Sequence, residues 1–401
     1  MILVINAGSS SIKYQLIDIE SQRVTAKGTV ERVGEGTSHI RHDVDGSVTE
    51  GAVVAPDHSS AFRAIAAMFD HAGPDLKRSG IAAVAHRVVM GGPDASEPVV
   101  ITEDVVARIE RLSPLAPLHN PANLAAILAA LDTLPHVPHV AVFDTAYFHD
   151  LPLVASTYAI DRKVSAAHSI RRYGFHGISH EYVSGVVGDW LGKVSPSPRP
   201  LRQIVLHLGN GASASAVVDG RAIDTSMGFT PLEGLVMGTR SGDIDPSVAF
   251  YLHREHGMTI ADIDRMLNHS SGLKGLSGHN DMRDVHRLIA SGDGAARLAL
   301  DIYVRRLQKY IGAYAAVMGG LDALTFTAGV GENDAVVRAE TIAPLGFLGI
   351  VLDPDRNDAA ASDDSVGVPR VISSDDSDVR VLVVPTREEL SMARQAAAIL
   401  R

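Results

Sequence analysis

The chain carries the same glycine-rich hairpin twice, with the two copies about half its length apart. The first copy spans residues 2–18 and turns at residues 6–11, and the second spans residues 204–220 and turns at residues 209–213. In each copy an apolar stretch enters the turn and another leaves it, which predicts a strand, a tight turn and a second strand. The small residues in the turns let backbone N–H groups approach a ligand closely. Two such turns facing each other would hold a polyphosphate, so the duplication predicts two similar domains.

The composition fits a soluble protein of this kind. At 401 residues the chain is long for a single hydrophobic core, and it has 46% hydrophobic and 21% charged residues. Its apolar runs fall short of the ~18 residues that a membrane span needs. The net charge of −11 argues against nucleic acid and against an anionic membrane as partners, although a local cluster of Lys and Arg could still hold a phosphate.

Two absences in the sequence narrow the chemistry and the compartment. The chain contains no cysteine, which excludes disulfides, thiol catalysis and thiolate metal sites. Its start lacks the basic segment and the long apolar stretch of a secretory signal, so we expect a cytoplasmic protein.

Helix and strand patterns alternate along the first half of the chain. Asn120 and Pro121 predict the cap and the first turn of a helix over residues 122–131. Residues 140–143 predict a buried strand that ends at Asp144. A polar residue just past the end of a strand is a typical site position in α/β folds.

The second half of the chain repeats this alternation. A helical pattern over residues 295–318 stops at the glycine pair 319–320, as helices often do. Residues 324–327 then predict a strand, and the glycine-rich residues 328–333 predict a loop before the next helix. Such a loop lets a phosphate or ribose lie against a helix N-terminus.

Five side chains could carry chemistry. Lys13 follows the first turn and could reach a phosphate or simply be solvated. Arg87 lies among apolar residues and needs an anionic partner, which a substrate or a structural salt bridge could equally supply. His176 and His180 have the i, i+4 spacing of two metal ligands, but the carboxylate of a zinc protease motif is missing between them, which argues against zinc. Arg240 lies in a segment too rich in Gly, Ser and Asp for a core, which indicates an anion site.

Ten segments match the motifs of one protein family in the same order. They are residues 4–13, 86–89, 116–121, 143–146, 172–177, 207–211, 224–246, 281–283, 326–333 and 385–390. On these residues the chain resembles the acetate kinase family, from residue 1 to about residue 395. One such motif alone is weak evidence, but the ordered set is specific.

The resemblance implies an α/β fold of the actin-like (ribonuclease H-like) superfamily, with two similarly built domains and a nucleotide cleft between them. It implies a first domain at residues 1–148, completed by a C-terminal helix at residues 388–401, and a nucleotide-binding domain at residues 149–387. The duplicated hairpin agrees with this architecture. The resemblance also implies a homodimer.

The resemblance further implies which residues bind the nucleotide and its metal. Asn6 and Glu388 match the region that binds Mg²⁺ or Mn²⁺, and Lys13 matches a contact to the nucleotide phosphates. The positions that resemble the family's ATP and ADP segments are His207, Leu208, Gly209, Asn210, Gly211, Asp281, Met282, Arg283, Gly329, Val330, Gly331, Glu332 and Asn333.

For the acid substrate, Arg87 resembles the family's clamp for the acetate carboxylate. The catalytic positions are Asp144, His176 and Arg240, of which His176 and Arg240 resemble stabilisers of the phosphoryl group in flight. The other substrate positions are Val89, Leu118, His119, Phe175 and Pro231, and all except His119 resemble the family's pocket for the methyl group.

Acetate is already ionised at neutral pH and has no proton to lose. We therefore expect Asp144 to orient Arg87 or a magnesium-bound water. Three neighbouring positions depart from the family pattern: Met90 where His is common, Ile178 where Thr is common, and Arg387 where Asn is common. They leave the matched roles in place but can alter the affinity for metal or anion.

The sequence thus predicts an enzyme that moves the γ-phosphoryl group of ATP to acetate, reversibly, giving acetyl phosphate and ADP in one in-line step. A propionate or butyrate kinase is the nearest alternative. A nucleotide-gated binding protein with no acyl acceptor is an alternative of another class. Arg87, His176 and Arg240 argue against it, because a nucleotide switch needs no second anion site opposite the γ-phosphate.

Overall fold

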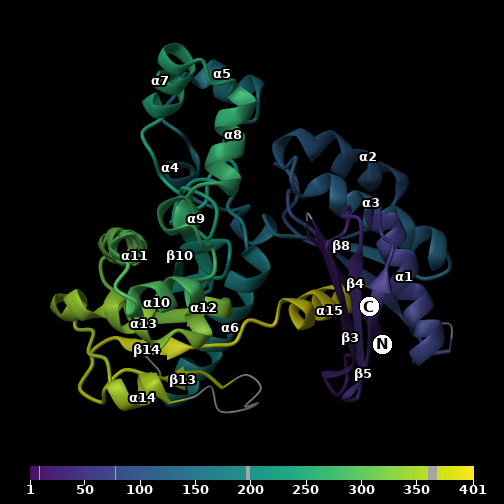
Figure 1. The fold of residues 1–401 in the computed structure, drawn as a ribbon. Coiled ribbons are helices and arrows are strands. Elements are labelled where there is room, and N and C mark those ends of the chain that lie inside the picture. Colours follow the sequence, from purple (N-terminus) through teal and green to yellow (C-terminus); the bar gives the residue numbers. More distant parts are fainter. Residues whose placement is uncertain (9, 77, 196–198, 360–367) are drawn as a thin grey trace. The chain divides into compact units, whose positions relative to one another are not determined.

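The computed structural model describes residues 1–8, 10–76, 78–195, 199–359 and 368–401 (Figure 1). Ser9, in the first predicted turn, lies outside the described residues. The chain divides into two compact units. The first unit is Met1–His149 with Arg387–Arg401, and the second unit is Asp150–Thr386. Each unit contains a β-sheet and several helices, so the predicted α/β class is confirmed.

The sheet of the first unit has the spatial order β5-β4-β3-β2-β1-β6-β8-β7. Its strands are β1 (Ile2–Ala7), β2 (Ser11–Asp18), β3 (Arg23–Glu31), β4 (Ser38–Val44), β5 (Ser47–Val53), β6 (Ala83–Val88), β7 (Val99–Val100) and β8 (His139–Phe143). Its α-helices are α1 (His58–Ala72), α2 (Glu103–Leu112), α3 (Asn120–Thr133) and α15 (Glu388–Ile399), and its 3₁₀ turns are η1 (Ser113–Leu115) and η2 (Ala146–Phe148).

The sheet of the second unit has the order β11-β10-β9-β12-β14-β13. Its strands are β9 (Arg202–Leu208), β10 (Ala212–Val218), β11 (Arg221–Thr225), β12 (Ala323–Thr327), β13 (Arg370–Val371) and β14 (Arg380–Val383). Its helices are α4 (Leu153–Ser156), α5 (Arg162–Ala167), α6 (Gly177–Val194), α7 (Ser247–His256), α8 (Ile260–His269), α9 (Gly272–Ser277), α10 (Met282–Ala290), α11 (Gly294–Met318), α12 (Ala328–Asn333), α13 (Ala335–Ile342), α14 (Pro354–Asp358) and the 3₁₀ helix η3 (Ala343–Leu348).

The six strands of the second sheet repeat the topology of six strands of the first sheet, and β4 and β5 are additional. In the first unit β1 pairs antiparallel with β2 and parallel with β6, and β6 pairs parallel with β8. In the second unit β9 pairs antiparallel with β10 and parallel with β12, and β12 pairs parallel with β14. The outer pairs also correspond, because β2–β3, β10–β11, β8–β7 and β14–β13 are all antiparallel. The prediction of two similarly built α/β halves from the duplicated hairpin is confirmed.

In each unit, helices pack against the sheet and form a hydrophobic core with it. In the first unit α1 begins after Asp57, whose carboxylate accepts the N–H of Ser60, and it buries Phe62, Ile65 and Phe69 at helical spacing. In the second unit apolar residues of α6 pack with buried residues of β9, β12 and β14. The apolar periods in the sequence therefore account for both cores.

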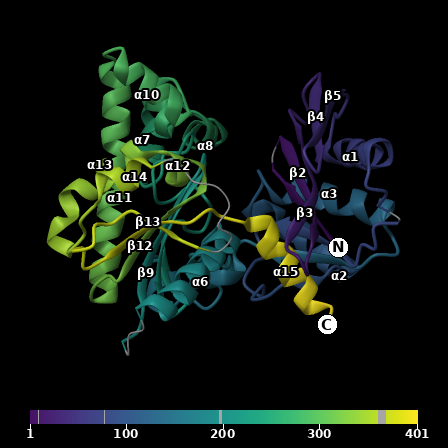
Figure 2. The ribbon, with the colours of Figure 1, turned by 90° about the horizontal axis from the view of Figure 1, so that it is seen from below.

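The C-terminal helix α15 belongs to the first unit, where it packs on β1, β6 and β8 (Figure 2). It buries Leu390, Met392, Ala393 and Ala396. Because α15 begins at Glu388, this packing puts Glu388 in the same unit as Asn6 and Arg87.

Two local predictions are wrong. Helix α3 is capped by the backbone of His119, and Asn120 is its first residue; the amide side chain of Asn120 instead bonds the N–H and C=O of Met90 at 3.0 Å each. Residues 328–333, expected to form a loop, form the short helix α12. The turn into α12 is made at Ala328, which has a positive φ of 64°.

Candidate active site

In the first unit, parallel strands bring Arg87 and Asp144 together. Arg87 lies on β6 and Asp144 directly follows β8, the neighbouring strand. Arg87 donates from Nη2 to Oδ2 of Asp144 at 2.6 Å, and from Nε to the same carboxylate at 3.1 and 3.2 Å. Its Nη1 donates to Oδ1 of Asn6 at 3.1 Å. Asp144 therefore orients the guanidinium group towards Asn6.

Electrostatics keep Arg87 charged. Burial alone would lower the pKa of its guanidinium, but the charges of Asp144 and Glu388 outweigh burial, and the pKa is raised above its ordinary value. A guanidinium has five N–H donors, and the bonds to Asp144 and Asn6 use three of its nitrogen atoms but leave N–H groups that a carboxylate could bind. The geometry is that of an oriented anion receptor.

Asn123 and His58 hold the first hairpin turn, and the sequence reasoning missed both. Asn123 donates to the carbonyl oxygen of Ala7 at 2.7 Å and accepts the N–H of Val89 at 3.1 Å, so it ties the turn to the chain just after Arg87. A ring nitrogen of His58 lies 2.7 Å from the carbonyl oxygen of Gly8. The only sequence signal for Asn123 is that it follows the predicted helix cap, Asn120, by three residues.

The other predicted residues of the first unit lie near these elements. Lys13 is exposed on β2, directly opposite Asn6 in the strand register. Val89 is 5% exposed and follows β6. Leu118 and His119 immediately precede α3.

In the second unit, His176 and Arg240 converge on the second hairpin turn. His176 precedes α6 and has a left-handed backbone (φ 57°), which is uncommon for a residue other than glycine and marks a constrained position. A methyl group built on Gly211 would lie 2.9 Å from Nη2 of Arg240 and 3.3 Å from Nε2 of His176. Both side chains therefore point towards the space where a side chain of residue 211 would begin.

Among the described residues, Arg240 has no acidic partner. Its Nη1 donates to the carbonyl oxygen of Pro231 at 2.7 Å, and in the part of the chain that the structure describes no carboxylate lies within ion-pair distance of it. Burial lowers the pKa of the guanidinium from 12.5 to about 10, so it stays protonated at neutral pH. A buried guanidinium with no carboxylate is a site for an external anion.

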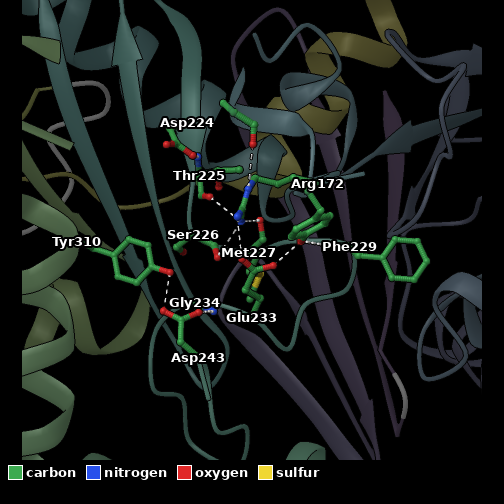
Figure 3. Close-up of polar contacts among 12 residues, drawn as sticks. Arg172, Asp224, Thr225, Ser226, Met227, Phe229, Glu233, Gly234, Asp243 and Tyr310 are labelled. Atoms are coloured by element: carbon green, nitrogen blue, oxygen red, sulfur yellow. Dashed lines mark hydrogen bonds and ion pairs between the residues drawn. The ribbon is translucent and has the colours of Figure 1, made fainter. Parts of the chain in front are cut away.

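A polar network braces the loop that carries Pro231 and Arg240 (Figure 3). Arg172 donates from Nη1 to the carbonyl oxygens of Thr225 (3.1 Å) and Met227 (3.0 Å) and from Nη2 to Glu233 (2.7 Å). Asp243 accepts the N–H of Gly234 and the hydroxyl of Tyr310, each at 2.8 Å. Glu233 also accepts the hydroxyl of Tyr158. The sequence placed Arg172 in a motif but gave no sign of these bonds.

A cavity of about 550 Å³ adjoins the second turn. Its lining residues are Gly209, Asn210, Gly238, Leu273, Asn280, Asp281, Met282, Arg283, Tyr303, Gly329, Val330, Asn333 and Asp334. Eight of the thirteen predicted nucleotide-binding positions are in this lining, and His207, Leu208, Gly211, Gly331 and Glu332 are not. The volume is within the range of small-molecule sites and suits a nucleoside.

The other predicted nucleotide-binding positions do not line the cavity, and several of them make packing or hydrogen-bond contacts instead. Leu208 is fully buried, and a methyl group on Gly331 would lie 3.3 Å from the carbonyl carbon of Phe326, so both are packing positions. Glu332 accepts the N–H groups of Ala328 (2.8 Å) and Thr386 (3.0 Å). The ring of His207 stacks on that of His176 with centroids 4.2 Å apart.

The three departures from the family pattern are explained in part. Met90 and Ile178 are buried and act as core residues. Arg387 immediately precedes Glu388 and places a positive charge beside this predicted metal ligand.

Neither a protein-only metal cage nor a membrane segment is found among the residues that the structure describes. No group of three or more His, Cys, Asp or Glu side chains is arranged to hold a metal ion in the described ranges. Within the same ranges, no helix is long and apolar enough to cross a membrane.

Comparison with known proteins gives full-length matches. Residues 1–394 match the acetokinase family. The chain is 58% identical to an acetate kinase of Leifsonia xyli subsp. xyli, over 98% of each protein. Its structure is similar to that of the Porphyromonas gingivalis acetate kinase, with a TM-score of 0.90 and 41% identity, covering 100% of this chain and 99% of that one. A propionate kinase from Francisella tularensis subsp. tularensis also gives a TM-score of 0.90, with 38% identity over 98% of each chain. The predicted actin-like fold is thereby confirmed.

Proposed function

This chain belongs to the acetokinase family and is a phosphotransferase, and we propose that its reaction is the reversible, Mg²⁺-dependent transfer of the ATP γ-phosphoryl group to acetate. The products are acetyl phosphate and ADP, formed by direct in-line transfer. The observation that carries this proposal is the convergence of Arg240 and His176 above Gly211, next to a cavity of nucleoside size.

Phosphoryl transfer needs positioning and charge neutralisation more than covalent chemistry. Arg240 and a ring N–H of His176 would bind the oxygens of the phosphoryl group as it moves. Residues of the cavity would hold the nucleotide, and the family resemblance assigns Lys13 to the nucleotide phosphates. The second anion site is Arg87, whose N–H groups would bind the carboxylate of acetate, while Asp144 fixes the direction of the guanidinium.

The donor atoms near Arg87 fit Mg²⁺. Asn6 offers an amide oxygen and Glu388 a carboxylate, and both flank Arg87 in the first unit. Mg²⁺ prefers oxygen ligands and is commonly held by one or two protein groups together with substrate phosphates. Bound there, the ion would supply positive charge to the phosphate oxygens.

We propose acetate as the acid because four apolar residues resemble the family's pocket for the methyl group. The family resemblance assigns Val89, Leu118, Phe175 and Pro231 to the methyl group and His119 to the substrate. We include in the proposal a cytoplasmic homodimer, on the family resemblance. A propionate kinase is the second candidate, because the chain is similar in structure to one.

The test is acyl phosphate formation with purified protein, ATP and Mg²⁺, trapped with hydroxylamine as the acyl hydroxamate. Acetate, propionate and butyrate are compared at equal concentration, with ADP release measured in parallel. We expect hydroxamate and ADP in equal amounts, and the highest kcat/KM with acetate. ADP release without hydroxamate would reject the acid as acceptor, and a higher kcat/KM with propionate would favour the second candidate.

A further inference from the structure

Behind His176, four side chains are hydrogen bonded in series. Nδ1 of His176 lies 2.9 Å from Oγ of Ser213, and the same oxygen lies 2.7 Å from Nε2 of His180. Nδ1 of His180 lies 2.8 Å from Oγ of Ser215. Ser213, Ser215 and His180 are fully buried. We call these residues the His176 chain.

Secondary structure sets the spacing of the chain. His176 is the N-cap of α6 and His180 lies in the first turn of this helix, and the rings of both reach the hydroxyl of Ser213. Ser213 and Ser215 alternate along β10, so their hydroxyls lie on one face of the strand. The start of the helix and the strand face each other, which gives the two histidines hydrogen-bond partners on β10.

If Ser213 donates to one ring and accepts from the other, the protons of the His176 chain can be arranged in two ways. Each hydroxyl donates one hydrogen, and each neutral imidazole carries one N–H. His180 is neutral, because burial and then the nearby His207 lower its pKa well below 6.5. In one arrangement Ser215 donates to His180, His180 to Ser213 and Ser213 to His176, which leaves the proton of His176 on Nε2. In the other, every bond is reversed and the proton of His176 is on Nδ1.

Only the first arrangement gives His176 a donor at the anion site. Nε2 is the nitrogen that points at Gly211 together with Nη2 of Arg240. With the proton on Nδ1, a bare lone pair of Nε2 would face phosphate oxygens, which is repulsive. We propose that Ser213, backed by His180 and Ser215, is a positioning residue that keeps the proton of His176 on Nε2 and its ring aimed at the phosphoryl group. This inference rests on the proposed function.

Two other side chains lie close to the ring of His176. His207 stacks on it from β9, and Arg240 adds a positive charge from the loop after β11. Nδ1 of His207 lies 2.8 Å from Oγ of Ser179, which accepts the hydroxyl of Thr386 at 2.8 Å. A second proton on His176 would sit on Nδ1, and Ser213 could then no longer donate to that nitrogen.

The direct test is a long-range ¹H–¹⁵N NMR spectrum of the full-length protein labelled with ¹⁵N-histidine, with the His176 signals assigned from their loss in His176→Gln. We expect protonated Nε2 and bare Nδ1 for both His176 and His180 at neutral pH. A proton on Nδ1 of either ring would overturn the proposal. This readout does not depend on turnover, so it holds even if no acyl phosphate is formed, an outcome that would reject the proposed function alone.

The kinetic test uses Ser213→Ala. Loss of one buried neutral hydrogen bond is expected to lower kcat for acetyl phosphate formation about 3- to 10-fold, with the KM for ATP within about twofold of the wild type. The His176 spectrum should show mixed tautomers. The matched control is Ser184→Ala, which removes a buried hydroxyl of the same helix that donates to the carbonyl oxygen of Glu181. A Ser213→Ala protein with unchanged kcat and tautomer, or one indistinguishable from the control, would overturn the proposal.

Discussion

A methyl group at Gly211 tests the convergence of His176 and Arg240 without removing either side chain. Gly211 does not have a positive φ, so the backbone accepts alanine there. The added carbon would lie 2.9 Å from Nη2 of Arg240 and 3.3 Å from Nε2 of His176. Unstrained contacts between such atoms are about 3.5–4.0 Å, so the two groups must move by roughly 0.3–1 Å.

We expect this displacement to have a large effect on kcat and a small effect on the free energy of unfolding. A misplacement of ~1 Å can lower a rate by ~10²-fold, so we expect Gly211→Ala to lower kcat by roughly 10- to 100-fold. Alanine in place of glycine stabilises the chain by about 0.4–1 kcal/mol through the unfolded state, and crowding costs about 1–3 kcal/mol. The free energy of unfolding should therefore change by no more than about 2–3 kcal/mol.

The assay is hydroxamate formation at saturating ATP and acetate, with a thermal unfolding curve for each protein. The control is Gly192→Ala, an exposed position in α6 whose added methyl group meets no atom within 4 Å. It should keep wild-type kcat and gain about 0.5–1 kcal/mol of stability. If Gly211→Ala stays folded and its kcat is within threefold of the wild type, His176 and Arg240 do not act above Gly211.

Four further substitutions test other parts of the account. Arg240→Ala and His176→Ala should each lower kcat by ~10²-fold or more and leave the affinity for ATP within about threefold of the wild type. Steady-state kinetics and nucleotide titration measure the two quantities. If the main effect of either substitution is on ATP binding, the role of that residue is misassigned. Val89→Ala should lower the ratio of kcat/KM for acetate to kcat/KM for propionate, or bring it below one, because a methylene in an apolar pocket is worth ~1–3 kcal/mol. The KM for ATP should not change. An unchanged ratio would place the methyl pocket elsewhere. Glu233→Gln should destabilise the second unit by about 1–3 kcal/mol, because Arg172 loses its carboxylate; an unaltered thermal midpoint would refute the bracing role.

The parts of the fold that follow from local patterns could be predicted from the sequence. The two hairpins are β1–β2 and β9–β10, and Asp144 follows β8 as expected from the apolar run before it. The orientation of Arg87 by Asp144 was also anticipated, and the contact is present. Its role in catalysis stays a prediction, as do the roles of the other site residues.

The parts that depend on register and on long-range contacts could not be predicted. Asn120 looked like a helix cap, but its side chain bonds Met90, because a buried backbone next to the Arg87 strand needs partners. The spacing of His176 and His180 left the role of His180 open once zinc was argued against, and only the tertiary structure shows that the ring nitrogens of His180 face Ser213 and Ser215. Residues 328–333 looked like a loop because of their glycines, yet the carboxylate of Glu332 accepts the N–H of Ala328 and closes a helical turn.

The most direct test of the account is the stereochemistry at phosphorus. ATP made chiral at the γ-phosphorus with three oxygen isotopes is converted by the protein with acetate, and the configuration of the transferred phosphoryl group is determined. One in-line transfer between ATP and acetate, with His176 and Arg240 neutralising charge and no residue forming a covalent bond, predicts inversion of configuration. Retention would require two displacements through a phosphorylated residue and would contradict the account.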